Sequence, residues 1–237
     1  MKAVVLAGGK GTRLAPYTKI LPKPLMPIGD MPILEVLIKQ MKCAGVDEVI
    51  LTVGHLAELL RAFFQNGERY GLRVDYSFED KPLGTAGPLS LVKERLVDTF
   101  LVTNGDVLTT LDLNSMIESH HRSGAAATIA MHVREVKIDL GVLRFNGSYE
   151  LRDYIEKPSY RFHVSMGIYV FEPRVLNFIP YNKYLDFPDL ILKLIASGER
   201  VIGHPFDGYW QDLGRADDYE QAIQDFEGLK PQILGEG

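Results

Sequence analysis

The chain has 237 residues, a formal net charge of −5, 46% hydrophobic residues and 24% charged residues. This composition is ordinary for a globular protein, and the length fits one α/β domain with a large core. The net negative charge argues against a nucleic-acid partner or an anionic membrane surface, although a local pocket can still be basic. No stretch approaches the roughly 20 apolar residues of a membrane helix, so we expect a cytoplasmic protein that binds neither membrane nor nucleic acid.

Cys43 is the single cysteine, and it lies in an apolar-periodic stretch, residues 33–44. We therefore expect a buried structural thiol. One cysteine forms neither an internal disulfide nor a cysteine metal cluster, which suits a reducing compartment. The six histidines show no metal-ligand spacing, and the neighbouring pair His120 and His121 is expected at a solvated helix end.

The first half of the chain alternates short apolar runs with helical patterns. Strand patterns are found at residues 3–6, 49–53, 73–78 and 99–103. Apolar residues at helical spacing predict helices at residues 32–44, 56–64 and 86–96, the first opened by Pro32 and closed by Gly45. Strands and helices that alternate at this spacing predict βαβ units and a mainly parallel sheet.

The second half has a different pattern. A helix is expected near residues 113–122, followed by strand-like runs at 126–133, 141–145, 149–155 and 164–171. Asn146 and Gly147 form a hairpin signal between two of these runs, so the later strands are expected to be partly antiparallel. Helical patterns return at residues 188–196 and 216–226, and residues 228–237 are expected to fray as a C-terminal tail. The predicted fold class is α/β, a single-domain Rossmann-like three-layer α/β/α architecture with a mixed, mainly parallel central sheet over residues 1–227.

A glycine loop directly follows the first expected strand, in the sequence Leu-Ala-Gly-Gly-Lys-Gly-Thr-Arg-Leu that ends at Leu14. Glycines let the backbone approach a ligand, and successive N–H groups can form an anion-binding nest. The dinucleotide fingerprint fails because Leu14 occupies its third glycine position, and no window fits the Walker loop. A dinucleotide-dependent oxidoreductase is therefore disfavoured. Arg13 in the loop and Lys23, which two prolines flank, favour a triphosphate site instead.

The segment from Gly9 to Pro16, followed by Pro22-Lys23-Pro24, resembles the signature of the sugar-1-phosphate nucleotidyltransferases. The similarity runs from residue 1 to about residue 226. The resemblance implies that the loop wraps a nucleoside triphosphate and that Arg13 and Lys23 contact its phosphates. It also implies a reaction in which a sugar 1-phosphate attacks the nucleotide and pyrophosphate leaves. About residues 1–110 are then the nucleotide-binding half, and about residues 111–227 the sugar-phosphate-binding half.

Two aspartates are candidate metal ligands. Asp106 follows the strand expected at residues 99–103, and Asp212 lies in a Gly-Tyr-Trp-Gln-Asp element. Ligands of open α/β sheets gather at the carboxyl ends of strands, but an aspartate alone more often caps a turn or a helix. Both positions match the family's metal-binding aspartates, so the resemblance implies that they hold Mg²⁺ together with phosphate oxygens. Their spacing alone does not show that they meet.

The resemblance assigns the sugar phosphate to elements of the second half. Glu156 and Lys157 resemble the family's Glu-Lys-Pro element, in which the lysine holds the sugar's phosphate and the glutamate accepts hydrogen bonds from hydroxyls. As an isolated tripeptide this element would be an ordinary strand end. Gly141 matches a family glycine whose backbone approaches the sugar. Ser165 stands where the family more often has Asn, which changes the expected sugar contact.

Residues 79–87, Glu-Asp-Lys-Pro-Leu-Gly-Thr-Ala-Gly, carry the expected base specificity. Thymidylyl members of the family have a glutamine where Glu79 stands. A carboxylate only accepts hydrogen bonds, which suits the adjacent N1–H and amine of guanine better than it suits uracil or cytosine. The sequence from Pro82 to Gly87 also resembles that of GTP-using mannose-1-phosphate guanylyltransferases, so GTP is favoured. The alternative is that Glu79 simply points to solvent.

We therefore predict transfer of a nucleotidyl group from an NTP, GTP favoured, to a sugar 1-phosphate, mannose or heptose 1-phosphate favoured. Two alternatives stay open: a cytidylyl- or uridylyltransferase acting on another sugar phosphate or on a non-sugar phosphate such as phosphocholine, and a non-catalytic relative that senses nucleotide-sugar. The partners are the two substrates, and homo-oligomerisation is left open. The predicted catalytic residues are Arg13, Lys23 and Asp106; the nucleotide contacts are Leu6, Ala7, Gly8, Gly9, Gly11, Thr12, Arg13, Lys23, Glu79, Pro82, Gly84, Thr85 and Asp106; the sugar-phosphate contacts are Asn104, Gly141, Glu156, Lys157 and Ser165; and the Mg²⁺ ligands are Asp106 and Asp212.

Overall fold

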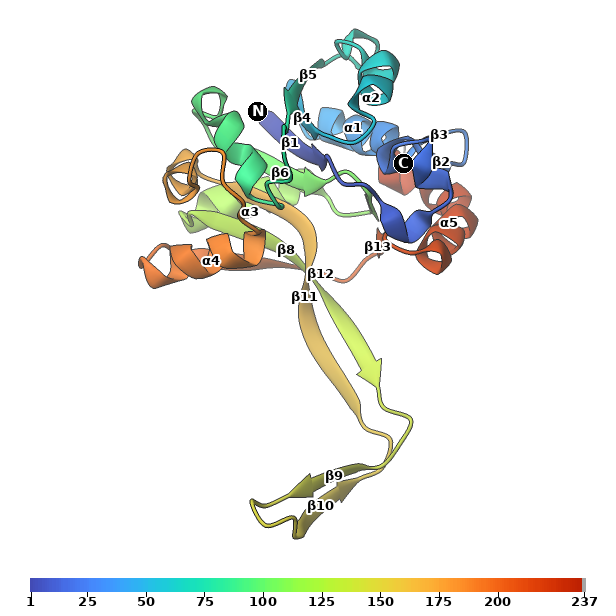
Figure 1. The fold of residues 1–237 in the computed structure, drawn as a ribbon, viewed down its shortest axis with the longest axis vertical. Helices are drawn as coiled ribbons and strands as arrows, with labels where there is room; N and C mark the ends of the chain where they lie inside the picture. The colour runs from blue at the N-terminus through green and yellow to red at the C-terminus, as the bar shows by residue number, and fades with distance from the viewer. Residues whose placement is uncertain (236–237) are drawn as a thin grey trace.

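A computed structural model describes residues 1–235 of the chain (Figure 1). The α-helices are α1 (Ile33–Cys43), α2 (Ala57–Phe64), α3 (Leu113–Ser123), α4 (Phe187–Ala196) and α5 (Ala216–Leu234), and the 3-10 helices are η1 (Thr12–Leu14), η2 (Tyr17–Lys19), η3 (Lys23–Leu25), η4 (Glu68–Tyr70), η5 (Gly87–Leu91), η6 (Lys93–Arg95) and η7 (Pro173–Phe178). The strands are β1 (Lys2–Ala7), β2 (Pro27–Ile28), β3 (Met31–Pro32), β4 (Glu48–Val53), β5 (Arg73–Phe78), β6 (Phe100–Asn104), β7 (Val107–Thr109), β8 (Ala127–Lys137), β9 (Val142–Phe145), β10 (Leu151–Ile155), β11 (Ser159–Phe171), β12 (Val201–Phe206) and β13 (Trp210–Asp212).

Seven of the strands form one sheet in the order β12-β8-β11-β6-β1-β4-β5. β11 runs antiparallel to both of its neighbours, β6 and β8, and the other neighbouring strands are parallel. In the central strand β1, Val4 pairs with Ile50 on one side and with Val102 on the other. The predicted mixed, mainly parallel sheet is confirmed. The carboxyl ends of β1, β4 and β6 share one edge, which is where α/β proteins bind their ligands.

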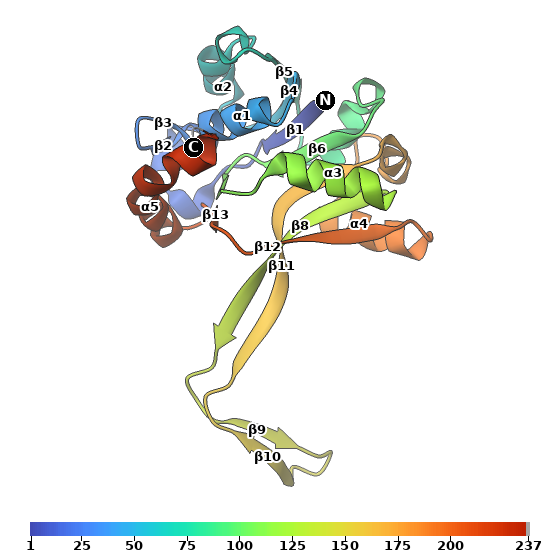
Figure 2. The ribbon, with the colours of Figure 1, turned by 180° about the vertical axis from the view of Figure 1, so that it is seen from behind.

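Helices cover both faces of this sheet. Val5 faces a core cluster that includes residues of α1, α2 and α3, whereas Val4 faces a second cluster with residues of α4, η5 and η7. Figure 2 shows α3 in front of the sheet, and Figure 1 shows α4 on the opposite face. Strands that are buried on both faces need apolar residues throughout, which explains the short continuous apolar runs in the sequence. The three-layer α/β/α prediction is confirmed.

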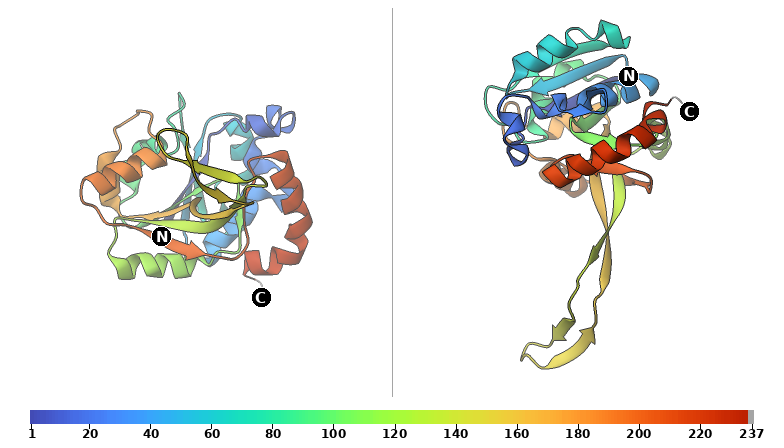
Figure 3. Two further views of the ribbon diagram at one scale, coloured as in Figure 1. Left: turned by 90° about the horizontal axis from the view of Figure 1, so that it is seen from below. Right: turned by 90° about the vertical axis from the view of Figure 1, so that its right-hand side faces the viewer.

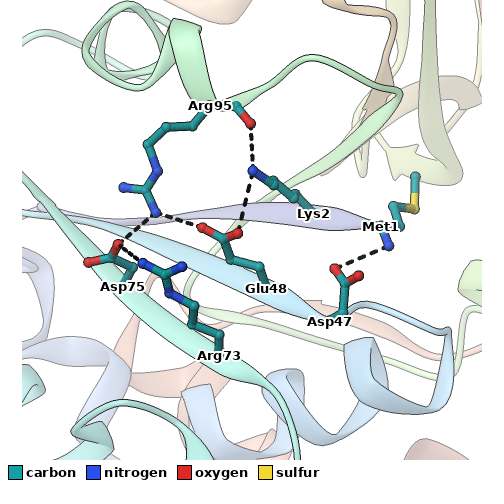
Figure 4. Close-up of polar contacts among 7 residues, drawn as sticks. All are labelled: Met1, Lys2, Asp47, Glu48, Arg73, Asp75 and Arg95. Atoms are coloured by element: carbon teal, nitrogen blue, oxygen red, sulfur yellow. Dashed lines mark hydrogen bonds and ion pairs between the residues drawn. The ribbon is translucent and has the colours of Figure 1, made fainter.

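A network of ion pairs joins β1, β4 and β5 near their amino ends (Figure 4). The Arg95 guanidinium donates to Glu48 at 2.7 Å and to Asp75 at 2.8 Å, and the Lys2 ammonium lies 3.4 Å from Glu48. Partly exposed pairs of this kind each contribute little to stability, and a network contributes more than isolated pairs. These charges hold neighbouring strands together at the end of the sheet that lies away from the glycine loop.

β8 and β11 continue beyond the sheet as a two-stranded ribbon with the β9–β10 hairpin at its far end (Figures 1 and 3). We call residues 133–165 the arm. A β-bulge between Ser165 and Tyr169 marks its root, where Gly167 has a φ of +75° that favours glycine. None of the residues 133–165 is buried. The hairpin predicted from Asn146-Gly147 is confirmed, because β9 and β10 pair antiparallel on either side of it.

The helix expected at residues 86–96 is wrong, because the 3-10 helices η5 and η6 occupy that stretch. Pro88 has no N–H group, and the backbone N–H groups of Ala86 and Gly87 donate to the Leu185 carbonyl instead of to a helical partner. Neither β12 nor β13 was predicted from the sequence. Both strands are only partly buried, so they lack the apolar runs that mark the central strands.

The expected C-terminal tail is wrong for the residues that the structure describes. Residues 228–234 form the last part of α5, in which Ile233 and Leu234 are buried at helical spacing from Phe226. These side chains pack in one cluster with Ile28 and Ile33, so the end of the chain is docked on α1. Residues 236–237 of the expected tail lie outside the described residues. No helix within residues 1–235 has the length and the apolar character to span a membrane.

The expectation for Cys43 is also wrong, because the thiol is exposed. The last buried residue of α1 is Met41, and Cys43, two residues later, lies on the exposed side of the helix. Its Sγ atom lies 3.6 Å from the carbonyl oxygen of Leu234. The apolar periodicity of residues 33–44 therefore did not predict the exposure of Cys43 correctly.

His120 is buried with 1% of its surface exposed, contrary to the expected solvated helix end. Its Nδ1 lies 2.8 Å from the Thr128 hydroxyl, and its Nε2 lies 3.1 Å from the Glu172 carboxylate. His121 is exposed, as expected. One imidazole of this pair thus lies inside the protein, and the other lies in solvent.

Stability should fall on acidification because of His120. Burial lowers the pKa of His120 below its ordinary value of 6.5, and the Glu172 carboxylate only partly offsets this effect. The folded state then binds the proton less tightly than the unfolded state, so stability is lost as the pH drops below about 6.5. We expect His120→Gln to weaken this dependence between about pH 7 and pH 5, measured as the urea midpoint of unfolding. His121→Gln should keep the wild-type slope, and an unchanged slope in His120→Gln would contradict the explanation.

Candidate active site

The glycine loop leaves the carboxyl end of β1 and leads into η1. A Cβ atom on Gly8 would lie 2.7 Å from the Glu79 carboxylate, so only glycine lets that side chain rest against the loop. Gly11 has a φ of +60°, and the Thr18 hydroxyl donates to its carbonyl oxygen at 2.8 Å. A Cβ atom on Gly9, in contrast, would meet open space. The loop is therefore held on both sides of Gly9 and open at Gly9 itself.

A cavity of about 590 Å³ opens between the loop and the segment that begins at Glu79. This volume lies in the usual range of small-molecule sites. Many of the residues predicted as ligand contacts line this cavity: Leu6, Gly8, Gly9, Glu79, Pro82, Gly84, Thr85, Asn104 and Asp106. Loop and strand ends thus form one site, as the strand-end rule requires.

Other predicted nucleotide contacts do not line this cavity. The Ala7 side chain is 3% exposed and belongs to the core beneath the loop, so only its backbone is available to a ligand. Gly11 and Thr12 lie where the loop turns into η1, and Arg13 follows on the same short helix. Lys23 is buried and reaches the cavity edge through its ion pair with Asp106.

Glu79 is half-buried at the side of the cavity. Its backbone N–H donates to the Val53 carbonyl at 3.0 Å, and its Oε2 accepts from the Leu83 N–H at 3.2 Å. Burial raises the pKa of Glu79, and the Leu83 hydrogen bond partly offsets this rise. The suggestion that Glu79 points to solvent is therefore wrong, because its carboxylate faces Gly8 and the cavity.

Thr85 lines the cavity, yet its polar groups have partners within the protein. Its N–H donates to Asp186 at 2.9 Å, its hydroxyl lies 3.1 Å from the same carboxylate, and the Phe187 N–H donates to that hydroxyl at 2.8 Å. Gly84 has a φ of +77°, which lets the backbone pass the Leu185 carbonyl. The observed role of this segment is to tie the cavity wall to the start of α4, and direct nucleotide contact by Thr85 stays a prediction.

The two aspartates meet through a short strand pair. β13 pairs with β7 in antiparallel register, so Asp212 lies opposite Val107, the residue after Asp106. The Leu213 N–H also donates to the Asp106 carbonyl at 3.0 Å. Lys23 forms an ion pair with the Asp106 carboxylate. Spacing in the sequence did not show this meeting, and the β7–β13 pairing produces it.

Charge at this carboxylate pair is unevenly balanced. The pKa of Asp212 is raised, first by burial and then by repulsion from Asp106, while Lys23 and Arg13 partly offset the rise. The Arg13 guanidinium lies beside Gly214, where a Cβ atom would approach it to 3.2 Å. Two repelling carboxylates with hard oxygen donors fit a divalent cation such as Mg²⁺, which takes one or two protein carboxylates and completes its shell with phosphate and water. Within residues 1–235, no group of three or more His, Cys, Asp and Glu side chains is placed to hold a metal without such added ligands.

The predicted sugar-phosphate residues are divided between two places. Asn104 lines the cavity, and the Gly167 turn at the arm root lies directly against its side chain. Ser165 is at the same root, with its hydroxyl 3.1 Å from the Tyr169 hydroxyl. Glu156 and Lys157 lie on the arm, between β10 and β11, and neither lines the cavity. The contact of Glu156 and Lys157 with a sugar phosphate stays a prediction.

Comparison with known proteins identifies the family. A family model described as nucleotidyl transferase matches residues 2–228. The chain belongs to the nucleotidyl transferase family. It is 37% identical to the UTP–glucose-1-phosphate uridylyltransferase of Synechocystis, over 94% of this chain and 63% of that protein. It is 34% identical to the mannose-1-phosphate guanylyltransferase catalytic subunit beta of Danio rerio, over 92% of this chain and 62% of that protein.

A solved structure has the same fold as this nucleotidyl transferase. HddC from Yersinia pseudotuberculosis, complexed with GMP-PN, matches with a TM-score of 0.72 and 25% identity, over 95% of this chain and 99% of that chain. The chain thus spans little more than three fifths of the two curated relatives, 63% and 62%, but nearly all of this solved structure. The predicted family and fold class are both confirmed.

Several cavity residues of this nucleotidyl transferase were not predicted. Gly54 and His55 follow β4, so the rule that ligands gather at strand ends could have found them. Lys10 of the glycine loop also lines the cavity. Lys81 and Tyr184 also line it. Tyr184 comes from a distant loop before α4 that no local pattern connects to the site.

Removing the Asp212 charge should stabilise the protein without ligands. Because the pKa of Asp212 is raised above 3.8, its ionised form destabilises the folded state at neutral pH. We expect Asp212→Asn to raise the Tm measured in a metal chelator and no nucleotide. Asp207→Asn, an exposed aspartate in the loop before β13, should leave the Tm unchanged. A lower Tm for Asp212→Asn would show that Lys23 and Arg13 outweigh the repulsion.

Proposed function

We propose that this nucleotidyl transferase transfers a nucleotidyl group from a nucleoside triphosphate to a sugar 1-phosphate, giving a nucleotide-sugar and pyrophosphate. The observation that carries the proposal is the meeting of the glycine loop, the cations Arg13 and Lys23, and the pair Asp106 and Asp212 at one edge of the sheet. Backbone N–H groups and two cations suit a triphosphate, and two carboxylates suit a divalent cation. The names of both curated relatives describe transfers of this class. A non-catalytic sensing protein would not need the loop, both cations and both carboxylates together.

The reaction joins two phosphate esters. An oxygen of the sugar 1-phosphate attacks the α-phosphorus of the nucleotide, and the bond from that phosphorus to the bridging oxygen of the β-phosphate breaks. The attacking oxygen is already anionic, so the reaction needs no general base. Catalysis then consists of holding the two anions in line and neutralising their charge. Arg13 and Lys23 neutralise the departing pyrophosphate, and the family resemblance gives Lys157 the attacking phosphate.

Asp106 and Asp212 would hold the Mg²⁺, which when bound neutralises charge on a phosphate oxygen. Lys23 is ion-paired with Asp106 in this structure. The lysine leaves that carboxylate for the phosphates when the nucleotide and its cation bind. One buried ammonium group therefore neutralises the carboxylate before binding and the triphosphate afterwards, which avoids leaving an unpaired buried charge in either state.

Glu79 supports GTP as the nucleotide, whereas the preference for mannose or heptose 1-phosphate rests on the resemblance to mannose-1-phosphate guanylyltransferases. The carboxylate faces the cavity beside Gly8 and has acceptor capacity beyond its hydrogen bond to Leu83. Guanine offers N1–H and an amine side by side to such an acceptor. The guanylyltransferase relative and the HddC structure with GMP-PN accord with this choice.

UTP and glucose 1-phosphate are the second candidate pair. The relative that carries these substrates in its name is 37% identical to this chain, against 34% for the guanylyltransferase. Uracil places N3–H between two carbonyl groups, which an ionised carboxylate would repel. The raised pKa of Glu79, caused by burial, leaves a larger protonated fraction that could donate to one of those carbonyls. A preference for UTP should therefore weaken as the pH rises.

The reaction class is tested by pyrophosphate release, with each of the four NTPs against mannose, heptose and glucose 1-phosphates and choline phosphate. We expect release with at least one sugar 1-phosphate, and Asp106→Asn should lower kcat by about 100-fold or more because charge on the phosphates is no longer neutralised. Asp98→Asn, an exposed residue away from the cavity, should behave as wild type. Release with no sugar phosphate, or unchanged turnover in Asp106→Asn, would overturn the proposal. Thermal unfolding of both variants checks that the fold is intact.

The base assignment is tested by Glu79→Gln. An amide presents one acceptor and one donor in place of two acceptors, so kcat/KM for GTP should fall about 10- to 100-fold while that for UTP falls less or rises. Asp80→Asn removes a neighbouring charge that also lines the cavity and should affect both nucleotides equally. If Glu79→Gln lowers kcat/KM equally for both nucleotides, Glu79 acts only by holding Leu83 and the cavity wall.

A further inference from the structure

The arm exposes an apolar surface that none of residues 1–235 covers. None of the residues 133–165 is buried, and eight of its large apolar side chains are exposed, among them Leu140 at 74% and Tyr149 at 86%. A two-stranded ribbon is at best marginally stable when it stands alone in water. Contiguous exposed apolar side chains mark surfaces that pack against a partner. The ribbon therefore needs a partner surface that the described part of its own chain does not supply.

The arm also carries a sugar-phosphate element that is already assembled. The Tyr154 hydroxyl donates to the Glu156 carboxylate at 3.2 Å, and the Tyr154 ring lies so close to the Gly141 backbone that a Cβ atom would not fit there. The Ile138 N–H donates to the Pro158 carbonyl at 3.0 Å and closes the segment. Lys157 has a φ of +45°, a backbone strain that persists at functional sites where the surroundings impose it.

This element stands far from the cleft of its own chain. β11 begins at Ser159, directly after the Glu-Lys-Pro turn, and starts to pair with β6 only at Ile168. At about 3.3 Å for each residue, the stretch between these two positions spans about 30 Å. Figure 1 shows the ribbon pointing away from the body. The root is fixed, because Met166 and Ile168 are buried and the Trp210 indole N–H donates to the Met166 carbonyl at 3.1 Å. These contacts hold the root of the arm on the body.

We propose that two copies of the chain form a two-fold dimer in which each arm crosses to the partner and places Glu156 and Lys157 at the sugar-phosphate side of the partner's cleft. This inference rests on the proposed function. One chain then supplies the loop, Arg13, Lys23 and the two aspartates, and the other supplies the cation and the acceptor for the sugar phosphate. A two-fold exchange is closed and completes both sites at once.

The missing parts of the cleft identify the partner as a second copy. Glu156 and Lys157, the predicted sugar-phosphate contacts, do not line the cleft of their own chain, and the arm of an identical chain carries both groups. An unrelated protein would cover the arm but would leave the cleft incomplete. The arm contains six Lys and Arg and five Asp and Glu residues, so its net charge is +1, whereas the whole chain carries −5. Long-range repulsion therefore does not oppose the approach of the arm to another copy.

Complementation in defined heterodimers tests the exchange. Two differently tagged chains are co-expressed, and the doubly tagged dimer is purified and assayed for pyrophosphate release. The pair Asp106→Asn with Lys157→Ala should have about half of the wild-type activity, because the intact body of one chain receives the intact arm of the other. Wild type paired with the double variant Asp106→Asn/Lys157→Ala should be inactive. Sites built within one chain predict the reverse, with activity only in the second pair.

Each remaining result has one meaning. An inactive first pair together with a half-active second pair overturns the exchange and leaves the proposed function standing. An active wild type that sediments as a monomer also overturns it, as does wild-type KM for the sugar phosphate in Lys157→Ala. The variant Phe162→Asp places a charge on the exposed face of the arm and should dissociate the dimer and raise that KM. If wild type is inactive with every sugar phosphate, the proposed function has failed, and the exchange fails with it.

Discussion

β13 pairs with β7 through three residues, and this short ladder holds Asp212 beside Asp106. The same segment orders its surroundings, because Gly214 leaves room for the Arg13 guanidinium and the Trp210 indole donates to the carbonyl of Met166 at the arm root. The carboxylates, the loop arginine and the direction of the arm are thus tied to one three-residue strand. Neither β7 nor β13 belongs to the seven-stranded sheet, although all three residues of β7 are buried. The core determines the fold, and the β7–β13 pairing brings together the two carboxylates of the candidate site.

The charges around this ladder explain why a site for polyanions contains two carboxylates. Repulsion from Asp106 and burial both act against ionised Asp212, and Lys23 and Arg13 compensate only in part. A divalent cation would relieve the repulsion and free Lys23 for the phosphates. The protein therefore holds an arrangement that is less stable alone than a neutral one would be, and ligand binding restores the balance. Such a trade-off is common where function requires charge in a partly buried place.

Local patterns in the sequence predicted what local forces determine. Short apolar runs predicted the central strands. The glycine loop with Arg13 and Lys23 predicted a phosphate site. The sequence did not predict β13, because three partly exposed residues have no pattern of their own. It also did not predict that α5 continues past Gly228, since its buried face there consists of few apolar residues at wide spacing. The place of Lys157 depends on the direction in which a long ribbon leaves the sheet, and pairing between β8 and β11 does not determine that direction.

The division between body and arm separates two specificities. The cavity that faces Glu79 belongs to the body, whereas Glu156 and Gly141 lie on the arm, so the choice of base and the choice of sugar can change independently. If the arms exchange, the second choice also depends on assembly. A free chain would keep its nucleotide cavity but would lack Lys157 and Glu156 beside it. Nucleotide binding would then survive dissociation while sugar-phosphate binding would not, and the dimer, not the chain, would be the unit that discriminates between sugars.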